Sequence, residues 1–141
     1  MKKVISILVI VLLYSCASTK NTSRNVLYEV LTVNNDGGAN IKFYEILTEA
    51  KEINMLLSDE GLRQKIKADD MANSSFLILN TGPTKESYNR MKIVKVVETL
   101  NEIEIYLKDT QMNLDVTEVD DTTKFPYTIV KVNSKKPIII K

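Results

Sequence analysis

The chain carries one thiol, Cys16, and no histidine. A protein without imidazole or a second thiolate cannot form the Ser-His-Asp and Cys-His groups of hydrolases or the usual zinc and copper sites. An intramolecular disulfide is excluded as well, because that bond joins two cysteines. The roles that remain for Cys16 are a covalent attachment point and an intermolecular disulfide.

Carboxylates are the other groups that could do chemistry, and the segment DVTEVDD at 115–121 is the densest in them. Calcium loops place alternating oxygen ligands around a turn that contains glycine, an order that this segment lacks. The two common glycine-rich phosphate-binding patterns are also missing. We therefore expect no enzyme activity, no catalytic residue, no metal and no cofactor. The alternative, an enzyme that uses carboxylates alone, needs at least two acids converging in one pocket.

The first 15 residues have the three-part layout of a secretory signal. Lys2 and Lys3 form the basic part, residues 4–13 are apolar except for Ser6, and small residues follow at 15–17. The apolar run is shorter than the roughly 20 residues of a membrane-spanning helix. It is therefore expected to act as an export signal and to be removed.

The end of this signal, LYSC at 13–16, resembles the lipobox of bacterial lipoproteins. The resemblance implies that acyl chains are attached to the sulfur of Cys16, which becomes the first residue after cleavage. Each buried methylene contributes about 0.8 kcal/mol, so several acyl chains hold a protein on a bilayer. No aspartate follows Cys16 directly, which resembles lipoproteins of the outer membrane. We expect residues 1–15 to be a lipoprotein signal peptide and the protein to be lipid-anchored in the bacterial cell envelope, at the outer membrane.

The chain after Cys16 is expected to be a tether and one domain. Residues 16–25 hold the lipidated cysteine and a polar, flexible segment that reaches roughly 15 to 18 Å. Residues 26–141 are the size of a single domain with one core. The full chain has 19 basic and 18 acidic side chains, a formal net charge of +1. This balance indicates neither nucleic acid nor anionic lipid as a partner.

The pattern of apolar residues predicts an α+β fold, with a small, mostly antiparallel β-sheet built from hairpins and one or two short helices packed on one face. Helical spacing within 49–66 predicts a helix of about ten residues and a second helical turn. Strands are expected at 27–33 and 41–47 as a first hairpin, at 75–79, at 91–99 and 102–108 as a second hairpin, and at 127–132 and 138–140 to close the sheet.

Two segments, 76–110 and 125–140, resemble the C-terminal domain of the PrcB-type protease-complex subunits. The shared features are an apolar strand, a loop with Gly82, Pro83, Thr84 and Tyr88, a β-hairpin and a late Pro-Tyr-x-Ile-Val motif at 126–130. The family has a Gly-Gly pair where this chain has KES at 85–87. The resemblance implies a non-catalytic accessory protein whose 80–90 loop binds a partner through Gly82, Pro83, Thr84 and Tyr88.

These observations predict a lipid-anchored envelope protein that acts as a protein-protein interaction or accessory module. The expected partner is another envelope protein, with a peptidase complex as a candidate, and no nucleic acid. The alternative is a protease inhibitor that presents the 80–90 loop, which distantly resembles the Pro-Thr loop of chagasin-type inhibitors.

We predict that Cys16→Ser leaves the domain folded but releases it from the membrane fraction, because the sulfur that carries the acyl chains is lost. Cell fractionation followed by detection of the protein measures the change. Membrane retention equal to that of the unaltered chain would contradict the lipid anchor.

Overall fold

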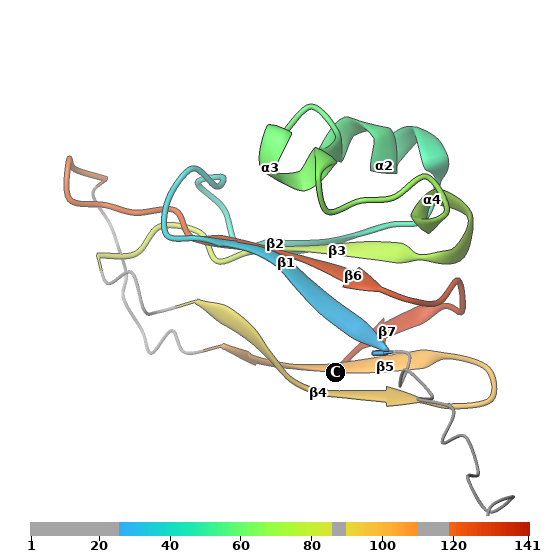
Figure 1. Ribbon diagram of the computed structural model, residues 1–141. Coiled ribbons are helices and arrows are strands. Elements are labelled where there is room, and N and C mark those ends of the chain that lie inside the picture. The colour runs from blue at the N-terminus through green and yellow to red at the C-terminus, as the bar shows by residue number, and fades with distance from the viewer. Residues whose placement is uncertain (1–25, 86–89, 110–118) are drawn as a thin grey trace, which may run out of the picture.

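The computed structural model describes residues 26–85, 90–109 and 119–141 (Figure 1). The predicted signal, Cys16, the tether and Tyr88 lie outside this part of the chain. The fold is α+β, as predicted, with seven strands and three short helices in the described residues. None of these helices is long and apolar enough to cross a membrane.

The strands form two sheets packed face to face, and the helices lie on the outer face of the larger sheet (Figure 1). The four-stranded sheet has the order β1-β6-β3-β2 and is antiparallel throughout. The three-stranded sheet has the order β4-β5-β7, with β7 parallel to β5. The bounds are β1 Tyr28–Asn34, β2 Phe43–Leu47, α2 Ala50–Leu56, α3 Glu60–Arg63, α4 Asp70–Asn73, β3 Ser75–Asn80, β4 Met91–Glu98, β5 Ile103–Asp109, β6 Tyr127–Val132 and β7 Ile138–Ile140.

The larger sheet has a cover on each face because its two central strands, β3 and β6, are apolar on both. Successive side chains of a strand point to opposite faces. Phe76 and Ile129 therefore pack under the helices, while Leu77 and Val130 pack against the three-stranded sheet. The molecule thus has three layers, one more than the predicted sheet with helices on one face.

The first predicted hairpin does not form, although both of its strands do. β1 pairs with β6 and β2 pairs with β3, so the two strands lie at opposite edges of the sheet. Their connection, residues 35–42, is longer than the 2 to 5 residues of most hairpin loops, which lets it cross the end of the sheet. The second hairpin, β4 with β5, is confirmed. β7 joins the smaller sheet beside β5 instead of closing the sheet that contains β6.

The helical layer follows the predicted segment and adds one short helix. α2 begins at a capping box, in which the Glu52 carboxylate accepts hydrogen bonds from the N–H groups of Glu49 and Thr48 at 3.1 and 3.0 Å. Ile53 and Leu56 of α2 are buried against the sheet. α4 is the added helix, and it leads directly into β3.

A buried lysine ties α4 to the larger sheet. Lys131 lies near the end of β6, where it pairs with Phe76 of β3, and is only 7% exposed. Its Nζ is 3.5 Å from Asp70 Oδ2 on α4 and 3.3 Å from Glu29 Oε2 on β1. A buried ammonium group needs such carboxylate partners to offset its loss of hydration.

Among the described residues, both apolar cores consist of residues between Leu27 and Ile140. One core lies between the helices and the larger sheet, and the other lies between the two sheets. In the part of the chain that the structure describes, these two cores join the three layers.

Candidate functional site

The candidate binding site is an apolar groove of about 330 Å³ between β1, at the edge of the larger sheet, and β4, at the edge of the smaller one. The two sheets enclose the core between them, but this side of their interface stays open. Ligand-binding clefts are typically apolar and of roughly this size or larger. Its lining is formed by Tyr28, Val30, Val33, Leu79, Arg90, Met91, Lys92, Ile93, Thr128 and Val130.

A β-bulge at Leu31 places the exposed side chains of the groove. The register of β1 against β6 shifts between Val30 and Thr32, so one extra residue stands in β1. The shift turns Leu31 into the core under the helices and leaves Val30 and Val33 on the groove side, each 47% exposed. Without the bulge, strict alternation would place Thr32 there instead of Val33.

The charged residues that line the groove are both basic. Arg90 and Lys92 lie at its β4 side, and none of its lining residues is acidic. The Arg90 guanidinium donates a hydrogen bond from Nη2 to Asn35 Oδ1 at 2.9 Å, which fixes its direction. An apolar segment that carries a negative charge fits these surroundings, since the apolar part covers the valines and the charge meets the two cations.

Three loops meet at the end of the sandwich next to the groove: residues 35–42, 80–85 and 119–126 (Figure 1). The buried Asn80 joins the first two. Its Oδ1 accepts a hydrogen bond from Ala39 N at 2.9 Å, and its Nδ2 donates to Ala39 O at 2.9 Å and to Ile41 O. Gly38 allows this approach, because a Cβ there would lie 2.2 Å from Asn80 Oδ1.

The 80–85 loop is pinned by its own backbone. Thr84 exchanges two hydrogen bonds with Lys124, at 2.8 and 2.7 Å. Gly82 has a φ of 82°, a conformation that suits glycine, and a Cβ there would come within 3.1 Å of Lys42 N. Thr84 is fully buried and Pro83 is half-buried.

Three of the four predicted binding residues, Gly82, Pro83 and Thr84, therefore determine the backbone shape of the 80–85 loop. Gly82 and Thr84 contribute little accessible surface, while Lys85 is the first exposed residue after them. Their role in binding stays a prediction, and in this conformation they act through the shape of the loop. The inhibitor alternative accordingly depends on Lys85 and the residues that follow it.

We call the region where the three loops meet the loop end. Two exposed aspartates, Asp36 and Asp120, link neighbouring loops there. N–H groups of Phe125 and Gly37 donate to Asp36 Oδ1 at 3.0 and 2.9 Å and lower the pKa of its carboxyl group. Lys85 Nζ, 2.9 Å from Asp120 Oδ2, lowers the pKa of Asp120 most, and Thr122 adds hydrogen bonds that act in the same direction.

The acidic segment at 115–121 is described only from residue 119 onward, where it forms part of the loop end. There, Asp120 faces Lys85 and its neighbouring threonines. In the part of the chain that the structure describes, no group of three or more acidic residues is placed to hold a metal ion.

Comparison with models of protein families, with curated proteins and with solved structures finds no match to this chain. The resemblance to the PrcB-type domain and the lipobox assignment remain predictions. The candidate site thus stands on its own geometry.

Sequence reasoning missed the groove, because its walls come from strands that are far apart in the chain. The available signal was in β1, where YEVLTV carries more apolar residues than an alternating edge strand needs. The adjacent valines and leucine are what a bulge distributes between two faces.

We predict that Asn80→Ala destabilises the domain by about 3 kcal/mol, since three buried hydrogen bonds contribute about 1 kcal/mol each. Urea unfolding measures the free energy, and amide hydrogen exchange at Ala39 reports the local loss. Asn40→Ala, an exposed position between the two residues that Asn80 binds, is the matched control and should change the free energy by less than about 0.5 kcal/mol. Equal effects of the two variants would show that Asn80 does not hold the loops together.

We predict that acid loosens the loop end and that Asp36→Asn removes part of this pH dependence. A carboxyl group whose pKa is lowered in the folded state stabilises that state above its unfolded pKa of about 3.9, and this stabilisation is lost as the pH falls through the folded pKa. The asparagine still accepts hydrogen bonds but does not titrate.

Hydrogen exchange of the Phe125 amide, followed from about pH 5 downward after correction for intrinsic rates, measures this effect. Glu60→Gln, an exposed change on α3, is the control and should leave the profile unaltered. A profile for Asp36→Asn that follows the unaltered chain would contradict the role of Asp36.

Proposed function

We propose that this chain is a lipid-anchored, non-catalytic protein of the bacterial cell envelope that binds another envelope protein, with a peptidase complex as the candidate partner. The apolar groove between β1 and β4 carries the proposal. Half-exposed Val30 and Val33 offer apolar surface that a partner would cover. Exposed apolar surface of this kind often marks a protein interaction site.

The braced loop end supports a role in binding as well. A surface that is already held in one conformation loses little entropy when a partner binds. The contacts of Asn80 and Thr84 hold the loops beside the groove before any partner arrives. The partner therefore meets a preformed surface made of the groove and the exposed residues at its loop end.

The chemistry of the groove also describes the partner. Its lining combines apolar side chains with Arg90 and Lys92. The matching segment has apolar residues next to an acidic side chain or a terminal carboxylate. Such a segment presents its charge to the two cations and places its apolar residues over the valines.

The test is affinity purification of the full-length chain from crosslinked cell membranes. We expect an envelope protein in stoichiometric amount with the unaltered chain and a loss of that protein with Val30→Glu. The added carboxylate would lie in the apolar groove and would lose its hydration when a partner covers it.

Met55→Glu is the matched control, because Met55 is 72% exposed on α2, in the helical layer that lies on the opposite face of the larger sheet from the groove. It should retain the partner. Recovery of no partner with any chain, or equal recovery with both variants, would overturn the groove as the binding site.

A further inference from the structure

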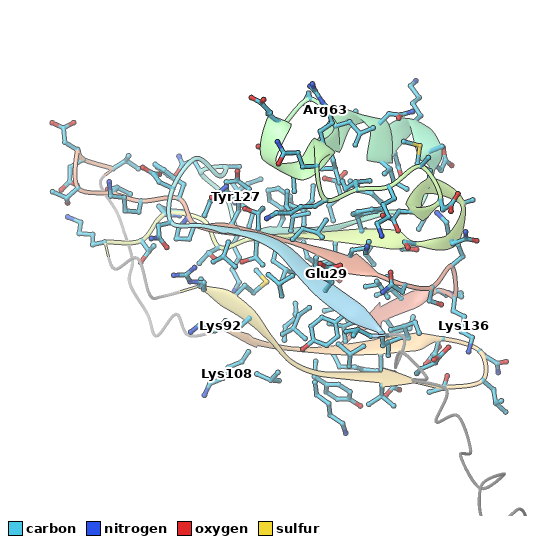
Figure 2. The ribbon with its side chains drawn as sticks, viewed as in Figure 1. Glu29, Arg63, Lys92, Lys108, Tyr127 and Lys136 are labelled. Carbon is cyan, nitrogen blue, oxygen red and sulfur yellow. The ribbon has the colours of Figure 1, made fainter. Side chains whose placement is uncertain are left out.

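The outer face of the three-stranded sheet has a charge pattern that the nearly neutral total does not reveal. Lys92 on β4 and Lys108 on β5 are direct cross-strand partners, and both are exposed. Figure 2 shows the two lysines at the same end of the sheet. Like charges directly opposite each other on two strands are destabilising, so this pair lowers the stability of the folded state.

A third lysine extends the pattern along the sheet. Lys95 pairs with Tyr106 across the strands, and its Nζ lies 5.2 Å from the centre of the tyrosine ring. Among the described residues, no carboxylate lies within ion-pair distance of Lys92, Lys95 or Lys108. We call these three residues the lysine face.

Apolar side chains accompany the lysine face. Val94, at the bulge of β4, is 58% exposed, and Ile139 on β7 is 37% exposed. One acidic residue on this face of β5, Glu104, is engaged, since it accepts a hydrogen bond from the Tyr106 hydroxyl at 2.8 Å and lies 3.9 Å from Lys141 Nζ. Cations mixed with apolar and aromatic side chains are typical of surfaces that rest on anionic lipid.

The first residues that the structure describes lie on the same side of the molecule. β1 begins at the level of the three-stranded sheet, and Leu27 and Tyr28 pack against the core between the sheets (Figure 1). An anchor joined to Val26 by a short tether would hold this layer, rather than the helices, toward the membrane. The reach of roughly 15 to 18 Å leaves little room for the domain to turn over.

We propose that the lysine face docks on an anionic membrane surface and orients the domain with its helical layer outward. The inference relies on the proposed lipid anchor for the position of the domain, but the attraction of the face for anionic lipid is a property of the sheet alone. The occupant is a lipid surface with negatively charged headgroups.

The test uses the chain from residue 16 onward with Cys16→Ser, which keeps the whole domain and carries no acyl chain. Its flotation with vesicles of phosphatidylcholine is compared with flotation with vesicles that also contain phosphatidylglycerol. We expect binding to the anionic vesicles only. Raising the salt to about 1 M should abolish it, because the Debye length falls to about 3 Å.

Lys95→Gln combined with Lys108→Gln should weaken vesicle binding by about 25-fold, since each lysine near an anionic surface contributes about fivefold. Lys92 is left unaltered because it also lines the groove. The matched control, Lys51→Gln combined with Lys67→Gln, removes the same charge from the helical layer and should leave binding unchanged.

Equal binding to neutral vesicles, or equal loss in the two double variants, would overturn the proposal. Binding to polyglutamate or duplex DNA without binding to anionic vesicles would assign the face to another partner and overturn it too. The outcome is separate from that of the proposed function. A failed anchor leaves the vesicle result intact, and a failure here leaves the anchor and the groove intact.

Discussion

The structure depends on the need to cover the larger sheet on both faces. β3 and β6 lie at its centre and bury nearly all of their side chains, so neither face can be left in water. The helices shield one face and the three-stranded sheet shields the other. The buried Lys131 is tolerated in this setting because Asp70 and Glu29 lie beside it.

The groove forms because the smaller sheet does not cover the whole of the larger one. The smaller sheet shields the centre of the larger one, where β3 and β6 lie, but its edge strand β4 leaves a gap along β1. The bulge at Leu31 then determines which β1 side chains occupy the gap. The proposed binding surface therefore forms where the two sheets pack together, between their edge strands β1 and β4.

The loop end is held by polar contacts and not by apolar packing. Asn80, Thr84 and Asp36 bind backbone groups of neighbouring loops that the strands leave unpaired. Buried backbone groups need such partners when they lie outside a sheet. The predicted residues Gly82 and Thr84 belong to this framework, which explains why a motif that suggests recognition is mostly buried.

The sequence alone determined the fold class, nearly all of the strand positions, the second hairpin and the location of the helical layer, because these follow from local periodicity. The lipoprotein signal that ends at Cys16 is likewise a local pattern, and the lipid anchor remains a prediction. Strand partners, the second sheet, the groove and the lysine face were decided only by the tertiary structure. Periodicity shows that β1 is a strand but not that β6 is its neighbour, and a sum of charges cannot show that Lys92 and Lys108 stand side by side. Such contacts between residues distant in the chain form when apolar faces are buried together, and they leave no local signal.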